Sequence, residues 1–342
     1  DLNQLEANIE TLANFFRRSK VDWRPHVKGI KIPAILHKAL KAGAIGGTCA
    51  KISEAEVMVN GGICDILIAN QIIGQRKIEK LARLCHKADV KVAVDHPNNV
   101  KQMGVIATQN KTEIGVLIEI NTGMNRLGLN KKDLFDNLDL IKSLPLTLIL
   151  SHLACADDVS NEENILQKNL FIKLCKSLPN IRKSISASHG TLLGKEFHFD
   201  MVRPGIGLYG GIKNDGLKQV IQIKVPVLQN FIIDKNMKVG YNFTFKAKNK
   251  MKVATLAIGY ADGLPRILSN RGKLFYEDLS CPIIGRISMD LVTVDISNLP
   301  EIPKYLYVFS SEYQVDDFAR DCETISHEVL VNLGERIDRV YA

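Results

Sequence analysis

The feature that most constrains this sequence is a regular alternation of short apolar runs and longer amphipathic segments between Trp23 and Tyr209. Short apolar runs predict β-strands, and apolar positions at helical spacing predict the helices between them. Such alternation is typical of βα units, and eight units within about 200 residues are most economically closed into a barrel. We therefore predict an α/β fold with a TIM-like (β/α)8 barrel. The predicted strands lie at 23–28, 45–50, 65–69, 91–95, 115–120, 146–152, 184–188 and near Met201.

The pattern changes beyond Gly211, where strand-like runs follow one another with turns and no long helices between them. This change predicts a second, mainly-β domain that ends in a helical stretch at 324–333. We place the barrel domain at residues 1–215 and the C-terminal β domain at 216–342. The strand-like runs of the second domain lie at 220–228, 231–233, 253–258, 282–287 and 292–296.

Composition excludes several classes of function. The chain of 342 residues has a formal net charge of +8, but its lysines are spread along its whole length and aromatic residues make up only 6%, so we expect no nucleic-acid partner. No apolar run approaches the roughly 18 residues of a membrane span, and no secretory signal is evident, so we expect no membrane association. The seven cysteines include no C-x-x-C pair, which argues against a disulfide framework or a zinc site. We expect no bound metal and a reducing, cytoplasmic location.

Polar residues at the predicted strand ends are the first candidates for chemistry, because barrel sites form at the carboxyl ends of the strands. Lys28 ends the first strand, where partial desolvation would lower its pKa and make a neutral amine available, although a surface lysine that caps the next helix fits equally well. Arg203 and Ser188 lie at the last two strands, beside glycine-rich turns whose N–H groups could hold a phosphate; a structural arginine is the alternative. His152 could be a core histidine, and Arg126 could be a fixed cation.

Three glycine-containing turns of the second domain present further candidates. They are Val239–Asn242, Ile258–Gly263 and Gly285–Asp290, and each carries a tyrosine or a Met–Asp pair. Neither a G-x-x-x-x-G-K phosphate loop nor a dinucleotide-binding fingerprint is present.

Several motifs between about residue 119 and the end of the chain resemble alanine racemase, in that family's order and approximate spacing. They are INTGMNRLGL, SHLACADD, DMVRPGIGLYG, VGYNFTF, IGYADGLPR and GRISMD. The first 112 or so residues instead resemble D-threonine aldolase, through RPHVKGIK, GTCAKISEAEVM, DILIANQIIG and VAVDHP. The chain is thus similar to a composite, or chimera, of two related pyridoxal 5′-phosphate (PLP) barrels of fold type III.

The resemblance implies a PLP-dependent isomerase that interconverts L- and D-alanine by a two-base mechanism. Both families carry the cofactor on a lysine after the first strand, which points to Lys28, with Lys31 as the competitor. Tyr241 is similar to the second catalytic base, which the partner subunit supplies, so the resemblance implies a homodimer with a shared site. The implied cofactor-binding residues are Lys28, Arg126, His152, Ser188, Arg203, Gly205 and Ile206. The implied substrate-binding residues are Arg126, Tyr260 and Met289.

This sequence departs from the racemase pattern at two places. Glu119 stands where the family often has a carbamylated lysine, and we hypothesise that it supplies the negative charge that orients Arg126. Ile32 and Glu335 stand where tyrosines often hold the phosphate.

Two other functions remain open from the sequence. The N-terminal motifs suggest a D-threonine aldolase-type enzyme that cleaves a carbon–carbon bond, although we find no His-x-Asp or His-x-x-Cys pair for the metal that this chemistry uses. A hybrid that binds PLP with little turnover is the third interpretation.

Overall fold

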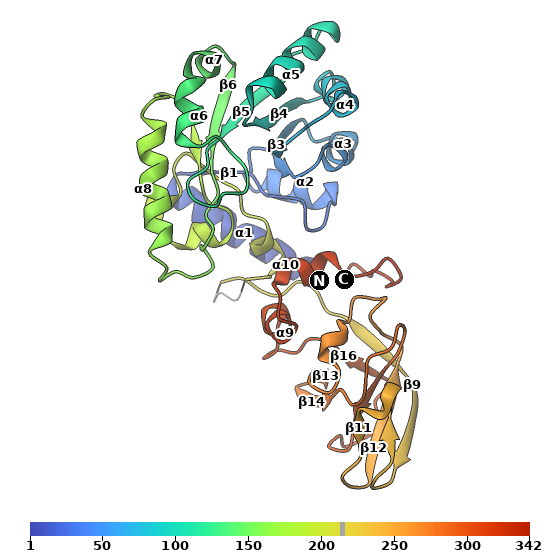
Figure 1. The fold of residues 1–342 in the computed structure, drawn as a ribbon. Coiled ribbons are helices and arrows are strands. Elements are labelled where there is room, and N and C mark those ends of the chain that lie inside the picture. The colour runs from blue at the N-terminus through green and yellow to red at the C-terminus, as the bar shows by residue number, and fades with distance from the viewer. Residues whose placement is uncertain (213–215) are drawn as a thin grey trace. The chain divides into compact units, whose positions relative to one another are not determined.

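A computed structural model describes residues 1–212 and 216–342 of the chain, which fold into two compact units (Figure 1). The barrel unit comprises Asn8–Leu208, and the β unit comprises Asp1–Ala7 together with Tyr209–Ala342. The predicted boundary after residue 215 falls on residues 213–215, outside the described residues.

Eight parallel strands form the barrel unit. Six of them pair side by side in the order β2-β3-β4-β5-β6-β7, and β1 pairs with β8. Isolated parallel bridges join His26 to Thr48 and Ala187 to Arg203, so β1 follows β2 and β8 follows β7 around a closed ring. The predicted (β/α)8 barrel is confirmed. Its strands are β1 Asp22–Trp23, β2 Gly47–Cys49, β3 Asp65–Gln71, β4 Asp89–Val94, β5 Gly115–Glu119, β6 Leu146–Leu150, β7 Lys183–Ser184 and β8 Met201–Val202.

Helices follow the strands and cover the outside of the ring (Figure 1). Residues 131–142 form two helices, because Asn137 ends α6 and begins α7. The strand predicted at 184–188 ends at Ser184, because Ser188 already has helical dihedrals (φ −50°, ψ −55°) ahead of a 3-10 turn, η1 (His189–Leu192). The helices are α1 Leu2–Ser19, α2 Pro33–Lys41, α3 Ile52–Asn60, α4 Gln75–Cys85, α5 Pro97–Gln109, α6 Lys131–Asp136, α7 Leu138–Lys142 and α8 Glu163–Cys175.

The barrel interior begins with an apolar layer. Ala93, Leu117, Leu150 and Met201, from four different strands, belong to one buried cluster. Because side chains alternate between the two faces of a strand, the residues two positions further along point to the same interior. The next inward layer, at the carboxyl ends of the strands, is therefore polar.

A six-stranded antiparallel sheet dominates the β unit, with strand order β14-β13-β16-β9-β12-β15. A bridge between Ile283 and Val294 links its two edges, which leaves no long free edge there. The mainly-β prediction is confirmed, but 220–228 and 231–233 belong to one strand, and 282–287 continues no strand beyond Pro282. The elements are β9 Lys224–Ile233, β10 Lys238–Val239, β11 Phe245–Lys246, β12 Met251–Leu256, β13 Lys273–Tyr276, β14 Leu279–Pro282, β15 Val292–Asp295, β16 Tyr305–Tyr307, α9 Val315–Asp321 and α10 Ser326–Val331.

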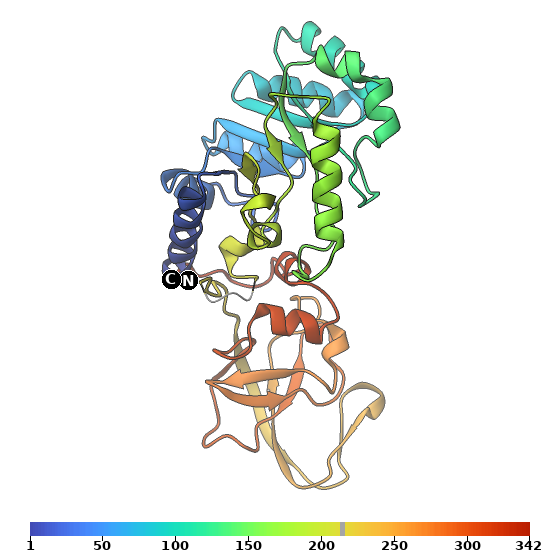
Figure 2. The ribbon, with the colours of Figure 1, turned by 90° about the vertical axis from the view of Figure 1, so that its left-hand side faces the viewer.

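Both termini belong to the β unit and lie side by side (Figure 2). The Leu2 amide donates to the Ala342 carbonyl oxygen at 2.6 Å, and the Asp1 amino group donates to the Val220 carbonyl at 2.9 Å. In the described ranges, no helix combines the length and the apolar character needed to cross a bilayer.

Candidate active site

The polar layer of the barrel gathers residues from four strand ends. Asp95, Glu119, His152 and Arg203 each lie two positions beyond a member of the apolar layer. They converge because parallel strands end at the same rim of the barrel. The structure thus brings the predicted His152, Arg203 and Glu119 to one place.

Arg203 is buried at the floor of this layer. One guanidinium nitrogen donates to Ser184 Oγ, and another donates to the Ser151 carbonyl oxygen at 2.8 Å. Burial lowers the pKa of Arg203, and the charge of Glu119 opposes that effect. A guanidinium nevertheless stays charged at neutral pH, so Arg203 is a fixed cation with donors only.

Lys28 leaves the barrel just after β1. The segment between β1 and Lys28 pairs with the chain that follows β8, because the His26 amide donates to the Pro204 carbonyl oxygen at 2.7 Å. Loss of hydration around the amine lowers the pKa of Lys28, the charges of Arg126 and Arg203 lower it further, and Glu54 opposes them. The Lys28 amine therefore lies within electrostatic reach of both predicted arginines.

Ser188, Gly205 and Ile206 form a second group at this rim. The Gly205 amide donates to Ser188 Oγ at 2.7 Å, and the Gly207 amide donates to the same oxygen at 3.3 Å. A Cβ at position 205 would lie 3.2 Å from both the Cβ and the carbonyl oxygen of His26, so only glycine fits without displacement. Both amides therefore point to the Ser188 hydroxyl, beside the turn that carries Lys28.

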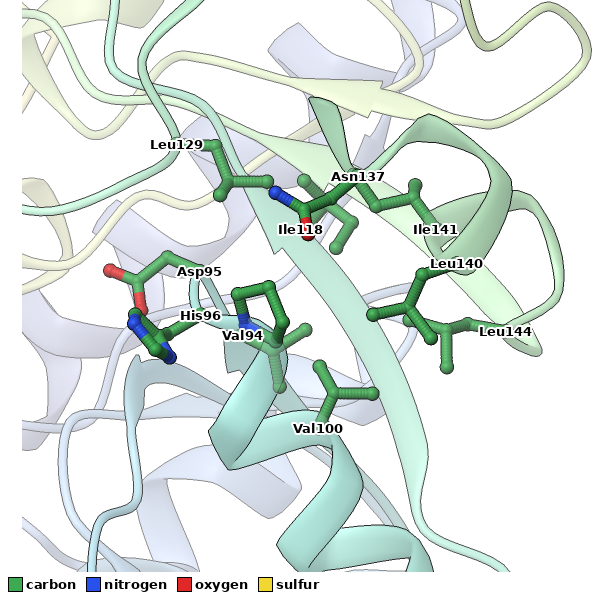
Figure 3. A pocket seen from close by; sticks show the side chains of 11 residues that line it. Val94, Asp95, His96, Val100, Ile118, Leu129, Asn137, Leu140, Ile141 and Leu144 are labelled. Atoms are coloured by element: carbon green, nitrogen blue, oxygen red, sulfur yellow. The ribbon is translucent and has the colours of Figure 1, made fainter. Parts of the chain in front are cut away.

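Glu119 is bound by a residue that the sequence did not indicate. The Gln71 side-chain nitrogen donates to Glu119 Oε2 at 2.7 Å and to Asp95 Oδ2 at 3.0 Å. Burial raises the pKa of Glu119 and the charge of Asp95 adds to this, whereas the Gln71 hydrogen bond, Arg203 and Arg126 lower it. Figure 3 shows Asp95 at the edge of a small cavity whose other side is lined by apolar side chains such as Ile118 and Leu140.

Arg126 is carried by the loop from Asn121 to Leu129. The loop is closed at its base, because the Asn121 amide donates to Leu129 and the Leu129 amide donates to Glu119, both at 2.9 Å. Asp95 Oδ2 also accepts the Gly128 amide at 3.0 Å. Arg126 itself is exposed and forms no ion pair with Glu119; in the part of the chain that the structure describes, it makes no hydrogen bond.

The three turns of the β unit also come together. A Cβ at Gly240 would lie 3.1 Å from the Arg286 amide, and the Tyr260 amide donates to the Ser288 carbonyl oxygen at 3.1 Å. Tyr241, Tyr260 and Met289 are 67%, 44% and 52% exposed, respectively, so their side chains are available to a ligand or a partner.

A C-terminal arginine joins two of these turns. Arg336 Nε lies 3.3 Å from Asp262 Oδ1, and its terminal nitrogen lies 2.7 Å from Asp290 Oδ1. The other oxygen of Asp262 accepts the Gly259 amide at 2.9 Å. Arg336 therefore links the turn that carries Tyr260 to the turn that carries Met289.

Sequence reasoning missed Gln71, Asp95, Glu54 and Arg336. Asp95 could have been found, because it is the last residue of the strand predicted at 91–95. It lies two positions after the buried Ala93 and therefore on the same, inward face. No comparable signal exists for Arg336, whose partners are distant in the sequence.

The fold and this site define a protein with a closed (β/α)8 barrel, a lysine at the exit of its first strand and a separate mainly-β unit. The chain belongs to the alanine racemase family. The family model for the alanine racemase N-terminal domain matches residues 1–213, and that for the C-terminal domain matches residues 220–341. The N-terminal match covers the whole of residues 1–112, so it does not separate that segment from the rest of the barrel domain.

Named relatives agree with this assignment. Alanine racemase from Rickettsia akari is 33% identical over 98% of each chain. Alanine racemase from Ruegeria sp. is 41% identical over 226 residues, which are 66% of this chain and 65% of that relative. The latter match thus spans slightly less than two thirds of the relative's length.

Solved structures agree as well. The crystal structure of alanine racemase from Bartonella henselae with covalently bound pyridoxal phosphate matches with a TM-score of 0.90 and 30% identity, over 100% of this chain and 98% of that chain. Alanine racemase from Pseudomonas aeruginosa matches with a TM-score of 0.88 over 99% of this chain and 97% of that chain, but at 24% identity it supports the fold alone.

Proposed function

We propose that this chain interconverts L- and D-alanine with PLP held on Lys28. The observation that carries the proposal is the position of Lys28 at the barrel rim, in the turn that follows the bridge between His26 and Thr48. Lys28 is an exposed residue, and desolvation of its amine together with the charges of Arg126 and Arg203 lowers its pKa. These surroundings favour the neutral form of the amine, which is the form that reacts with an aldehyde.

The rim residues fit a phosphorylated aldehyde. The amides of Gly205 and Gly207 both donate to Ser188 Oγ in this structure. A phosphate that took the place of this oxygen as acceptor would receive the same two amides, and the Ser188 hydroxyl would be a third donor. The absence of a side chain at position 205 keeps this approach open, because a Cβ there would press on His26. The family often holds the phosphate with tyrosines, but Ile32 and Glu335 stand at those positions in this chain. Backbone donors and Ser188 would hold the phosphate instead.

PLP, when bound, supplies an aldehyde for the substrate amine and a ring that withdraws electrons from the substrate Cα. Lys28 Nζ and Tyr241 Oη act on opposite faces of Cα: one removes the proton and the other returns it. Tyr241 comes from the partner subunit, so the proposal includes a homodimer. The high exposure of Tyr241 supports this role.

The remaining predicted residues would bind and orient. Arg203, a buried cation with donors only, would keep the pyridine nitrogen unprotonated, with His152 beside it. Arg126 would bind the phenolate oxygen of the cofactor and the substrate carboxylate, since guanidinium groups suit both anions. Ile206 would line the phosphate, and Tyr260 and Met289 would line the path of the substrate.

Borohydride trapping tests the proposal most directly. The protein is incubated with PLP, reduced and digested, and we expect the label on the peptide that contains Lys28. The variant Lys28→Ala should lose the label and alanine racemisation as measured by chiral chromatography, whereas the matched control Lys31→Ala should keep both. A label on Lys31, or an active Lys28→Ala variant, would show that the proposal is wrong.

Two further proposals concern origin and location. We propose that the first 112 or so residues derive from an aldolase-like barrel; release of acetaldehyde from D-threonine by the purified protein would indicate that aldolase activity survives. The seven free cysteines support a reducing, cytoplasmic location. The domain boundary after residue 215 stays a prediction.

A further inference from the structure

Two carboxylates, those of Asp95 and Glu119, share one hydrogen-bond donor at the base of the Arg126 loop. Asp95 and Glu119 end neighbouring strands at the same level, because Val94 pairs with Ile118. Glu119 is only 8% exposed, so the repulsion between two anions is weakly screened there. Such a pair needs a donor that serves both groups.

Gln71 is that donor. Its Nε2 atom carries two hydrogens, and the distances to Glu119 Oε2 and Asp95 Oδ2 allow one for each carboxylate. Its Oε1 atom is buried without a hydrogen-bond partner among the described residues. The opposite orientation of the amide would place an acceptor against both carboxylates, so these two contacts determine how the amide points.

An irregularity in β3 brings Gln71 to this position. The pairing of β3 with β4 shifts between Ile68 and Gln71, so that Gln71 lies opposite Ala93, two residues before Asp95. Bulges of this kind redirect side chains and are enriched beside active sites. A regular strand would place Ala69 opposite Ala93 instead.

Asp95 connects Gln71 to the Arg126 loop through hydrogen bonds. The oxygen that accepts the Gln71 amide also accepts the Gly128 amide at 3.0 Å. Gly128 has φ +96°, and a Cβ there would lie 2.8 Å from the Asn121 amide, so only glycine allows the loop to approach the end of β5 this closely.

We propose that Gln71 is a positioning residue: its amide holds the carboxylates of Asp95 and Glu119 together, and through Asp95 it fixes the loop that carries Arg126. The inference rests on the proposed function only for the task of Arg126, the binding of a cofactor oxygen and a substrate carboxylate. The loop geometry itself can be measured without cofactor or substrate.

The test compares two substitutions in the protein without added PLP. Gln71→Met keeps the length of the side chain but has no donor, whereas Gln71→Lys has three. Hydrogen exchange of the peptide that covers residues 121–129, followed by mass spectrometry, should be about tenfold faster in Gln71→Met, as expected for the loss of hydrogen bonds to charged groups. It should stay close to the wild-type rate in Gln71→Lys. Gln75→Met, which removes an exposed contact to Glu79, is the matched control and should change nothing in this peptide.

If Gln71 acted only by packing, exchange would be faster in Gln71→Lys than in Gln71→Met, because methionine fits an apolar environment better than lysine does. Unchanged exchange in Gln71→Met, or faster exchange in a folded Gln71→Lys, therefore overturns the proposal. Should Gln71→Met fail to fold by circular dichroism, the Gln71→Lys result decides alone. A loop that loosens as expected in a protein whose Lys28 cannot be trapped would support the role of Gln71 while the proposed function fails.

Discussion

At the scale of single residues, the site is governed by how burial and neighbouring charges shift proton affinity. Lys28 and Arg203 are cations whose pKa values are lowered, and Glu119 is an acid whose pKa is raised. In each case the largest cause is loss of hydration, which disfavours the charged form. Glu119 remains the hypothetical source of the charge that orients Arg126, although its hydrogen-bond donor is Gln71.

The raised pKa of Glu119 gives a stability prediction with a definite sign. A folded-state pKa above the unfolded value means that the native protein holds the proton more tightly, so stability is greatest below the unfolded pKa and falls as pH rises through the folded pKa. The side chain in Glu119→Gln is neutral at every pH, so the decrease in the free energy of unfolding that Glu119 causes should be absent from the variant. Asp95, Arg126 and Arg203 are unchanged in the variant. Urea unfolding at pH 4 and pH 8 should therefore show that the free energy of unfolding decreases less between these pH values in the variant than in the wild type.

Glu79→Gln, at a partly exposed position of helix α4, is a suitable control for that measurement. An equal pH-dependent loss in the wild type and Glu119→Gln would contradict the prediction. If Glu119→Gln also binds PLP and turns over alanine as the wild type does, the hypothesis that Glu119 orients Arg126 is wrong.

At the scale of elements, loops at strand ends present the candidate residues and contacts from distant segments hold those loops. The Arg126 loop is tied to the ends of β4 and β5, and the turns of Tyr260 and Met289 are tied to the C-terminal segment by Arg336. Loops supported in this way keep their side chains in place despite their exposure.

Arg336→Met removes the link between the two turns of the β unit. Exposed ion pairs contribute little to stability, so we expect the variant to fold and its melting temperature to change little. The KM for alanine should rise about two- to fivefold with a smaller change in kcat, because Tyr260 and Met289 would lose alignment with each other. Steady-state kinetics of both directions provide the measurement. Arg339→Met is the matched control, and equal KM values in the two variants would show that the link has no role in substrate binding.

At the scale of the whole molecule, the chain consists of a closed parallel barrel and a sheet-based unit, each with its own group of candidate residues. The barrel unit carries Lys28, Arg126 and Arg203, and the β unit carries Tyr241, Tyr260 and Met289. A two-base mechanism requires one base from each group, and the proposed homodimer would supply them from different subunits.

Mixing two inactive variants tests this arrangement. Lys28→Ala and Tyr241→Phe should each lose racemisation in both directions, because every turnover needs both bases. If a site takes Lys28 from one subunit and Tyr241 from the other, a mixed dimer has one intact site of two. Equal amounts of both chains, unfolded and refolded together, should therefore recover about a quarter of wild-type activity, because half of the dimers are mixed. Activity no higher than that of the separate variants would indicate that each chain forms its own site or that no dimer forms.

The barrel and its rim residues could be predicted from the amino-acid pattern, because strand period and strand ends are local properties. Eight short apolar runs predicted the closed ring, and Lys28, His152 and Arg203 followed from their places at strand ends. Local patterns did not indicate the break at Asn137, where capping outweighs periodicity.

The contacts that hold those residues in place could not be predicted, because they form between distant segments of the folded chain. The pairing of Gln71 with Asp95 and Glu119 depends on an irregular strand register, and the link from Arg336 to Asp262 and Asp290 joins segments that lie far apart in the sequence. Register and long-range contacts are set by the packing of the whole fold, because the free energy of each pairing depends on every neighbour that shares the core.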